Sequence, residues 1–236
     1  MKQRLPTVEY SKCLSPEYVC WIDIMGISCL MKRSVFTAAI IISRFQKLLS
    51  QQFIQSEKFC IYPIMDGAFI TSKSKQDLLN FLENVFVSLS DNFVNENNNF
   101  YKFIVRACIS YGLVGHGNDI DDLDFKNKDK LVFGLPIIQS FTQEHKAPPF
   151  GIYIHQSARL MAPLVNEKTG DDFDHKPFST RWYVWFKNNE SMQRELLLRL
   201  NEYYDWCESQ SYSLPYDTNK VKKHKEMAKQ YFQMMV

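Results

Sequence analysis

A nearly unbroken apolar stretch that contains a single carboxylate constrains this chain more than any other feature. Residues 18–24 read Tyr-Val-Cys-Trp-Ile-Asp-Ile, a β-prone run typical of a strand that is covered on both faces. The charge of Asp23 cannot stay bare there, so its carboxylate must be solvated, hydrogen-bonded or bound to a cation. Gly26 follows three residues later and permits a tight turn whose amides can face a bound anion. This order of strand, acidic residue, turn and helix favours a site for a metal and a phosphate.

The length of the chain fits one domain with appendages, because 236 residues exceed the usual size of a small domain only modestly. No Pro-, Gly- or Ser-rich linker, low-complexity tract or internal repeat divides it. We expect an N-terminal arm over residues 1–16, a catalytic domain over 17–188, and a helical extension over 189–236 that packs on the same domain.

Charge and cysteine usage narrow the class of protein. The formal net charge is only +2, so a strongly electrostatic nucleic-acid partner is not expected. The six cysteines are scattered without a Cys-x-x-Cys pair, which favours a reduced, cytoplasmic protein. The first residues lack the apolar core of a signal peptide, and no apolar run approaches the ~20 residues needed to span a bilayer. We therefore expect a cytoplasmic protein without a membrane span.

Hydrophobic periodicity predicts alternating strands and helices in the first half of the chain. Asp66-Gly67 separates two β-prone runs and is typical of a hairpin turn. Ser74 is the expected N-cap of the helix that follows the hairpin, with Asp77 in its first turn. The expected strands are 18–24, 53–64, 68–71 and 101–113, and the expected helices are 30–49 and 74–94. This β-α-β-β-α-β order predicts a ferredoxin-like or palm fold, an α+β sandwich.

The second half of the chain predicts shorter elements. Glycines at 112, 115 and 117 are expected to end the strand 101–113 and to form a hairpin turn, not a phosphate loop. An acidic loop at 119–124 follows and is interpreted as solvated. The remaining strands are expected at 131–133, 150–154 and 181–187, and the remaining helices at 135–145, 190–208 and 221–235.

The palm order places Asp23 and Asp66 opposite each other on neighbouring strands. Two carboxylates at that distance repel, and a divalent cation between them removes the repulsion. Their hard oxygen donors suit Mg²⁺ or Mn²⁺ bound largely through the phosphates of a nucleotide. Two such ions can activate a hydroxyl and stabilise a departing pyrophosphate. The alternative is that Asp23 caps a turn and Asp66 merely belongs to the hairpin. Arg106 lies inside an apolar strand and needs an anionic partner, either a phosphate or base of a ligand or a structural carboxylate.

Short motifs over about residues 17–160 resemble, in the same order, those of class III nucleotidyl cyclases. Residues 21–28 are similar to their first metal-binding motif, Asp-Ile-x-Gly-Phe-Ser/Thr, and residues 61–70 to their second, which contains Gly-Asp. Residues 105–112 resemble their Arg-x-Gly-Ile-x-x-Gly strand, and residues 133–138 and 151–154 resemble the two segments that follow.

The resemblance also implies which residues form the active site. It implies catalytic roles for Asp23, Asp66 and Arg106, with two Mg²⁺ or Mn²⁺ ions per active site. The implied metal ligands are Asp23, Ile24 and Asp66, and the implied nucleotide-binding residues are Tyr62, Gly26, Ile27 and Arg106.

Departures from the family pattern concern the base and the transition state. Tyr62 stands where purine cyclases carry a base-reading Lys, and Leu131 where they carry an Asp. Ile138 and Thr142 stand where they carry an Asn and an Arg that stabilise the transition state. In these respects the chain is similar to the pyrimidine cyclases of the bacterial Pycsar anti-phage system. These have Tyr at the base-reading position and a helix of the pattern Gly-x-x-Ile-Ile-x-x-x-x-x-Glu, which corresponds here to Gly134, Ile137, Ile138 and Glu144.

The Pycsar resemblance implies a homodimer that converts CTP or UTP into cyclic CMP or cyclic UMP at its subunit interface. The messenger would activate a separate effector protein in an infected cell. A phenol fits this view because it hydrogen-bonds or stacks on a small ring and narrows the pocket against purines. The alternative is a catalytically silent, cyclase-like module that binds nucleotide or mediates dimerisation, which the missing Asn and Arg favour. A diguanylate-type synthase is disfavoured, because the hairpin lacks a Gly-Gly-Asp/Glu signature.

Overall fold

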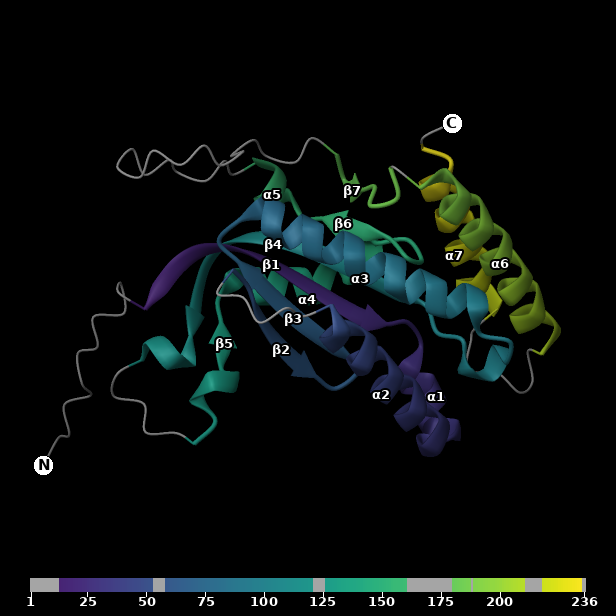
Figure 1. Ribbon diagram of the computed structural model, residues 1–236, viewed down its shortest axis with the longest axis horizontal. Helices are drawn as coiled ribbons and strands as arrows, with labels where there is room; N and C mark the ends of the chain where they lie inside the picture. The colour runs from purple at the N-terminus through teal and green to yellow at the C-terminus, as the bar shows by residue number, and fades with distance from the viewer. Residues whose placement is uncertain are drawn as a thin grey trace, which may run out of the picture.

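The protein is built around one mixed β-sheet with helices on both faces, as the computed structural model shows (Figure 1). The structure describes residues 13–52, 58–120, 126–160, 180–187, 189–210 and 218–234. The strands are β1 (Leu14–Ile24), β2 (Cys60–Ile64), β3 (Gly67–Ser72), β4 (Val105–His116), β5 (Val132–Phe133), β6 (Ile152–Ile154) and β7 (Trp182–Tyr183). The helices are α1 (Ile27–Arg33), α2 (Val35–Gln51), α3 (Lys75–Asn95), α4 (Leu135–Gln143), α5 (Gln156–Leu160), α6 (Glu190–Ser209) and α7 (Thr218–Phe232). Short 3₁₀ helices are η2 (Asn99–Tyr101), η3 (Gly117–Asp119), η4 (Lys128–Lys130) and η5 (Glu144–Lys146).

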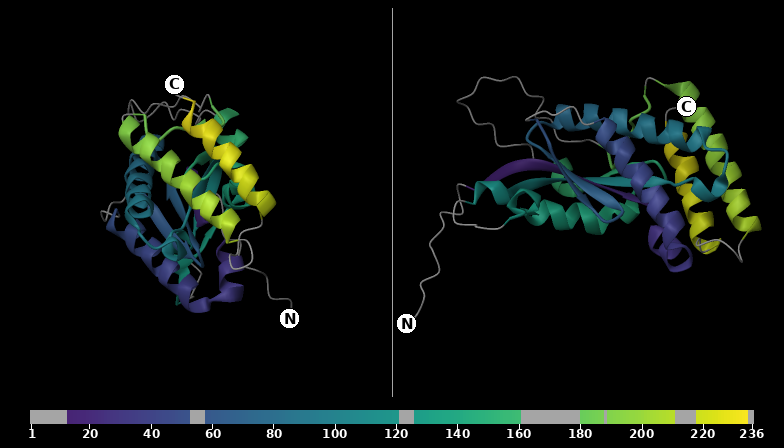
Figure 2. Two further views of the ribbon diagram at one scale, coloured as in Figure 1. Left: turned by 90° about the vertical axis from the view of Figure 1, so that its right-hand side faces the viewer. Right: turned by 60° about the horizontal axis from the view of Figure 1, so that its bottom comes forward.

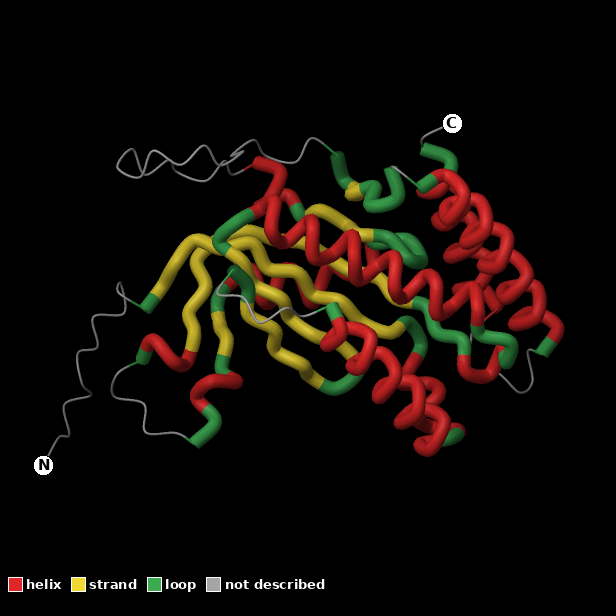
Figure 3. The backbone as a smooth tube through the Cα atoms, viewed as in Figure 1, coloured by secondary structure: helices red, strands yellow, loops and turns green. Residues whose placement is uncertain are grey.

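Strand order confirms the predicted palm fold. The sheet runs β2-β3-β1-β4-β6-β7, with β5 paired to β4. β1 lies antiparallel between β3 and β4, and β2 forms a hairpin with β3. The helices α2 and α3 make the two crossovers, so the first four strands have the ferredoxin-like β-α-β-β-α-β arrangement. Figure 3 shows these strands as one continuous layer.

The two faces of the sheet carry different side chains because successive residues of a strand point to opposite sides. The even-numbered residues 18–24 of β1 join the main apolar core with α2 and α3. The odd-numbered residues 19 and 21 join a second apolar cluster with Tyr62, Phe69 and Val114. α4 lies on this second face, opposite α2 and α3 (Figure 2). The main core extends into α6 and α7 through Leu196, Leu200, Val221 and Tyr231.

The helix predicted over 30–49 is two helices. α1 ends at Arg33, Ser34 is extended with φ −151° and ψ 94°, and α2 begins at Val35. The hydroxyl of Ser34 accepts a hydrogen bond from the backbone N–H of Thr37 at 3.2 Å. A serine in this conformation is a favoured N-cap, so it starts a new helix where apolar spacing alone predicts a continuous one.

The predicted hairpin is present, but its turn lies one residue earlier than the Asp-Gly pair indicates. Ile64 pairs with Gly67, so Met65 and Asp66 form the turn, and Met65 has a positive φ of 53°. Gly67 belongs to β3 instead. A Cβ on Gly67 would lie 2.5 Å from the ring of Trp21, so the glycine makes room for that indole.

β4 continues to His116, three residues beyond the end predicted at 113. The glycines expected to end the strand instead allow close packing: a Cβ on Gly115 would lie 2.3 Å from the ring of Phe133 on β5. The late strand predicted over 181–187 is confined to β7, and Trp185 lies in the turn that follows. β1 begins at Leu14, inside the segment predicted as an arm, and residues 1–12 lie outside the described residues. Most of the acidic loop, residues 121–125, also lies outside them.

Among the residues that the structure describes, no helix combines the length and apolar character needed to cross a membrane.

Candidate metal and nucleotide site

Two carboxylates meet where β1 ends. Asp23 pairs with Gly67 of β3 on one side and with Arg106 of β4 on the other. Asp66 occupies the β2–β3 turn next to it, and its carbonyl oxygen accepts a hydrogen bond from the N–H of Ile24 at 3.3 Å. The structure therefore brings Asp23, Ile24 and Asp66, the predicted metal ligands, to one end of β1, where Asp23 lies on the second sheet face and the side chain of Ile24 lies in the main core.

Burial disfavours the ionised form of both carboxylates at this end. Burial raises the pKa of Asp23 to about 7; the charge of Arg106 opposes this shift, and the nearby carboxylates of Glu144 and Asp66 add to it. Burial also raises the pKa of Asp66. A divalent cation would favour the ionised form of both groups.

The donor set fits a metal that is shared with a ligand. Among the described residues, no group of three or more His, Cys, Asp or Glu side chains is arranged to hold a metal ion. Asp23 and Asp66 supply two hard oxygen donors, which suits Mg²⁺ or Mn²⁺ whose coordination is completed by phosphate oxygens and water.

Arg106 finds structural carboxylates as its partners. Its Nη2 donates to Oε1 of Glu144 at 2.8 Å, and its Nε lies 3.4 Å from Oδ1 of Asp23. Glu144 belongs to η5, directly after α4, so this ion pair ties α4 to the end of β1. In this structure the guanidinium bridges the two acids, and the shorter contact is to Glu144.

The turn after β1 has the predicted conformation. Gly26 has φ 78° and ψ 4°, a left-handed conformation that glycine adopts without strain, and it precedes the first residue of α1. The N–H of Met25 donates to the carbonyl oxygen of Ile104 at 2.8 Å, which fixes the turn against the start of β4. Gly26 and Ile27, two predicted nucleotide-binding residues, thus directly follow Met25 and the predicted metal ligands Asp23 and Ile24.

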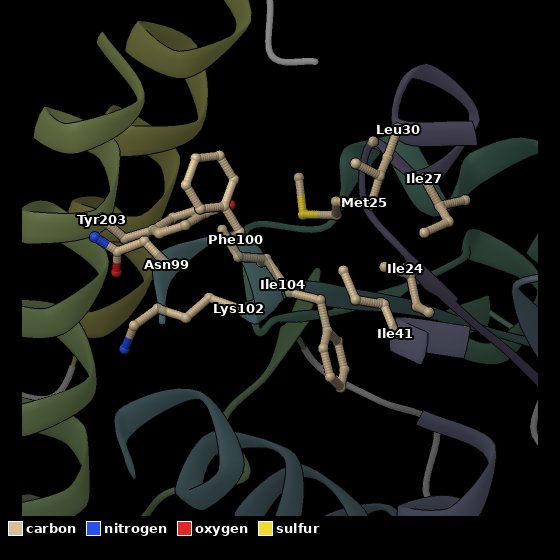
Figure 4. A pocket seen from close by; sticks show the side chains of 12 residues that line it. Ile24, Met25, Ile27, Leu30, Ile41, Asn99, Phe100, Lys102, Ile104 and Tyr203 are labelled. Carbon is tan, nitrogen blue, oxygen red and sulfur yellow. The ribbon is translucent and has the colours of Figure 1, made fainter. Parts of the chain in front are cut away.

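A small cavity lies behind this turn and is distinct from the carboxylates. Its volume is about 50 Å³, and neither Asp23 nor Asp66 lines it. Figure 4 shows Met25 and Ile27 on one side and Phe100 and Tyr203 on the other. The cavity is too small for a nucleotide, because ligand pockets usually measure roughly 300 Å³ or more.

Tyr62 does not lie beside Asp23. It pairs with Phe69 of β3, which pairs with Trp21 of β1, so Tyr62 lies two strands away from β1, at about 5 Å per strand, and two residues along the register from Asp23. Its side chain is 7% exposed, and its Oη lies 2.5 Å from Nδ1 of His116. The predicted base-reading residue and the predicted metal ligands therefore occupy separate parts of the same sheet face.

Three polar residues of this face were not identified from the sequence as members of a site. Glu144 forms an ion pair with Arg106. His116 is hydrogen-bonded to both Tyr62 and Glu17. A signal for Glu17 exists: counting back from Asp23 by twos along the strand reaches Glu17, so both side chains lie on one face. His116 lies beyond the predicted end of its strand and carries no such signal.

The outer surface of α4 is apolar. Leu135, Ile138 and Phe141 are 64%, 61% and 53% exposed and recur every three residues, so they share one side of the helix. Leu113 of β4 and Met65 of the hairpin turn are exposed as well. The hydroxyl of Thr142 donates to the carbonyl oxygen of Ile138 at 2.8 Å, so it is engaged within α4.

No protein-family model matches the chain, and no curated protein matches it. Solved structures similar to it are adenylyl and guanylyl cyclase domains. A bacterial light-regulated adenylyl cyclase is 14% identical, with a TM-score of 0.48 over 61% of this chain and 77% of that one. The monomeric guanylyl cyclase domain of the RhoGC fusion protein from the aquatic fungus Blastocladiella emersonii is 12% identical, with a TM-score of 0.43 over 60% and 81%. An adenylate/guanylate cyclase/hydrolase from Silicibacter pomeroyi is 16% identical, with a TM-score of 0.43 over 60% and 76%.

Proposed function

We propose that the chain is a nucleotidyl cyclase that converts a pyrimidine nucleoside triphosphate, CTP or UTP, into its 3′,5′-cyclic monophosphate and pyrophosphate. The observation that carries the proposal is that Asp66, in the β2–β3 turn, lies beside Asp23 at the end of β1 of a palm sheet, close enough for its charge to raise the pKa of Asp23. The motif resemblance to class III cyclases supports the same assignment of these two residues.

The chain's own groups have the following roles in this reaction. Asp23, Asp66 and the carbonyl oxygen of Ile24 would hold two Mg²⁺ or Mn²⁺ ions together with the triphosphate. When bound, these ions neutralise the phosphate charge and make the 3′-hydroxyl a better nucleophile. Arg106 stays anchored to Glu144 and turns its guanidinium from Asp23 to a phosphate oxygen, a geometry that suits arginine. In this proposal the backbone N–H groups of Gly26 and Ile27, which follow the end of β1, contact the phosphates.

Selectivity for pyrimidines rests on Tyr62 and Leu131. The phenol of a tyrosine at the base-reading position leaves less room for a purine than an extended lysine does. The phenol can also hydrogen-bond to a small pyrimidine ring. Leu131 cannot accept the hydrogen bonds that a purine-reading Asp accepts. The product would serve as a messenger for a separate effector, as the resemblance to the anti-phage pyrimidine cyclases implies.

A homodimer is part of this proposal. The exposed apolar surface of α4 lies on the same face as the candidate site, and burying it against a second copy removes it from water. Isologous packing of two such faces would place the site at the subunit interface, where each copy contributes groups that the other lacks.

Incubation of the purified protein with each of the four nucleoside triphosphates and Mn²⁺, followed by mass spectrometry, tests the proposal. We expect a cyclic pyrimidine monophosphate and pyrophosphate. Asp66→Asn should reduce product by about 10³-fold or more, because it removes a metal-binding charge with little change in volume. Asp91→Asn, on the exposed surface of α3, is the matched control and should stay active. Cyclic AMP or cyclic GMP as the main product would contradict the pyrimidine assignment, and a fully active Asp66→Asn would contradict the metal assignment.

A catalytically silent nucleotide-binding module is the second candidate. It is favoured by the pairing of Arg106 with Asp23 and by Ile138 and Thr142 at the positions of the family's transition-state donors. A folded dimer that binds nucleotide but releases no pyrophosphate from any of the four triphosphates would establish it.

A further inference from the structure

The junction between α1 and α2 exposes two neighbouring apolar side chains. Val35 and Phe36 are the first two residues of α2, and they are 72% and 76% exposed. A single exposed apolar residue is common on protein surfaces. An adjacent pair of this exposure keeps a valine and an aromatic side chain in water, and docking against another apolar surface would remove that cost.

The exposure of this pair does not come from loose packing of the two helices. Ile27 at the start of α1 is buried in the main core, and so are Ala38 and Ile41 of α2. Ser34 between the helices caps α2, and its hydroxyl accepts the hydrogen bond from the backbone N–H of Thr37. The core contacts of α2 begin after its first turn, so the apolar pair extends beyond the core from a fixed backbone.

The junction lies at an outer end of the molecule. α1 leads away from the end of β1, and α2 returns toward the sheet, so the turn between them is the outermost part of this helix pair (Figure 1). The two other views also place it at the periphery (Figure 2). The apolar pair is therefore presented on a projecting tip.

The surroundings of the pair are cationic. Lys32 and Arg33, in the last turn of α1, are both exposed. No carboxylate of the described residues forms an ion pair with either side chain. Residues 24–56 contain two Lys and two Arg and no Asp or Glu, although the chain has 26 acidic residues. This segregation of charge favours an anionic partner for the α1–α2 tip, which consists of Lys32, Arg33, Val35 and Phe36.

Shape and charge together select the class of partner. A second copy of the chain would bring like charges together at the same tip, which opposes association. A stable protein partner usually covers about 800 Å² of each surface, more than four side chains at a projecting end provide. A nucleic acid would pair with the cations but leaves the aliphatic side chain of Val35 without a role. A bilayer with anionic lipids uses all four side chains.

We propose that the α1–α2 tip docks the protein peripherally on anionic lipid membranes. Val35 and Phe36 enter the boundary between headgroups and acyl chains, and Lys32 and Arg33 bind headgroup phosphates. No helix crosses the bilayer in this arrangement. Two cations and two apolar side chains give weak, reversible attachment that salt weakens further, because the electrostatic part is screened. The inference does not depend on the proposed cyclase reaction.

Sedimentation of the purified protein with lipid vesicles at low salt tests the apolar part of the tip. We expect partition onto phosphatidylcholine vesicles with added phosphatidylglycerol to exceed partition onto pure phosphatidylcholine by roughly tenfold or more. Phe36→Glu should lower the partition by roughly tenfold, because it removes the largest inserting side chain and adds a charge that the lipids repel. Phe36→Leu should retain most of it. Leu198→Glu is the matched control, since it makes the same change at an exposed apolar position of α6 and should leave partition unchanged.

A second pair of variants tests the cations. Lys32→Gln combined with Arg33→Gln should lower partition onto the anionic vesicles by roughly tenfold and reduce its dependence on salt. Lys222→Gln combined with Lys223→Gln removes two exposed cations from α7 instead, and should leave both quantities unchanged. Equal losses in the two double variants would show that total charge, not the tip, holds the protein on the lipid, and would overturn the inference.

The remaining outcomes also decide the matter. Absence of binding to the anionic vesicles at low salt, or a folded Phe36→Glu that binds them as the wild type does, overturns the inference. Binding of the tip to single-stranded RNA but not to vesicles would assign it to a nucleic acid, and a change of mass in Phe36→Glu by light scattering would assign it to contacts between copies. Circular dichroism shows whether each variant is folded. If Phe36→Glu is not, the Lys32 and Arg33 double variant decides, because both side chains are exposed and lie outside the core.

Discussion

Arg106 and its two carboxylate partners determine how available Asp23 is to bind a metal ion. The guanidinium holds Glu144 at 2.8 Å and Asp23 at a longer 3.4 Å. Without Glu144 the full charge of Arg106 would fall on Asp23 and compete with a metal ion for the same oxygen. Glu144 therefore keeps Arg106 close to Asp23 without a tight ion pair between them.

Replacing Glu144 by Gln tests this role. We expect a loss of stability of about 1–3 kcal/mol, because the half-buried guanidinium loses a charged acceptor. We also expect half-maximal activity to require several-fold more Mn²⁺, as Arg106 pairs more tightly with Asp23. Urea unfolding and a Mn²⁺ titration of activity measure the two effects. Glu190→Gln is the control, since Glu190 pairs with Arg194 on the exposed surface of α6 and should change stability by less than ~0.5 kcal/mol. An unchanged Mn²⁺ requirement in Glu144→Gln would remove this role from Glu144.

Some residues of the candidate site could be predicted from the sequence and others could not, because only some of their contacts are encoded locally. The proximity of Asp23 and Asp66 could be predicted because each stands out against its local pattern, as a charge in an apolar strand and as part of a hairpin turn. The partners of Arg106 and Tyr62 could not, because Glu144 and His116 are 38 and 54 residues away along the chain. A contact over such a distance is created by strand order and packing, and no local spacing encodes it.

At the scale of elements, the β2–β3 hairpin is the part that places Asp66. Its turn is set by the fit of Gly67 beneath Trp21, not by the conformational freedom of an Asp-Gly pair. A side chain at Gly67 would meet the indole ring at 2.5 Å and the backbone oxygen of Ile22 at 2.6 Å. Because backbone atoms are on one side of this contact, the hairpin must move as a whole to relieve it.

Gly67→Ala should therefore lower stability by about 1–3 kcal/mol and displace Asp66 from Asp23. Chemical denaturation measures the first effect, and cyclase activity at saturating Mn²⁺ measures the second. We expect the loss of activity to exceed that of Ser34→Ala, a control in which the lost N-cap of α2 costs about 1 kcal/mol at a distance from the turn. Equal activity of the two variants at equal stability would show that the turn does not position a catalytic group.

The elements themselves were largely predictable where local signals agree. Helical apolar spacing and the Ser74 cap predicted α3, whose first turn that hydroxyl caps at 3.2 Å. Errors arose where a tertiary contact overrides local preference. β4 continues past its glycines because β5 pairs with its end at Gly115 and His116. The helix over 30–49 breaks at Ser34 because a cap outweighs the continuity of the apolar pattern.

At the scale of the whole molecule, the two sheet faces differ in how they are covered. α2, α3, α6 and α7 bury one face in the main core, whereas α4 is, among the described helices, the one that packs on the middle of the other face. α4 also turns Leu135 and Ile138 outward, and Phe141, whose ring contacts Trp21, remains half exposed beside them. A solvated helix usually keeps such positions polar, so this surface is the expected contact of the proposed homodimer.

Ile138→Glu should convert the dimer into a monomer and remove activity. A carboxylate on the isologous surface meets its own copy across the two-fold axis, so each substitution acts twice and places like charges close together. Light scattering coupled to gel filtration measures the mass, and circular dichroism shows that the fold persists. Leu198→Glu is the matched control, because Leu198 is 51% exposed on α6, away from α4, and should leave mass and activity unchanged. A monomeric Ile138→Glu with full activity would show that one chain holds the complete site, and a fully dimeric one would place the interface elsewhere. Inactive monomers that regain activity when mixed with Asp66→Asn, which keeps its own α4 surface intact, would show that the two copies share the site.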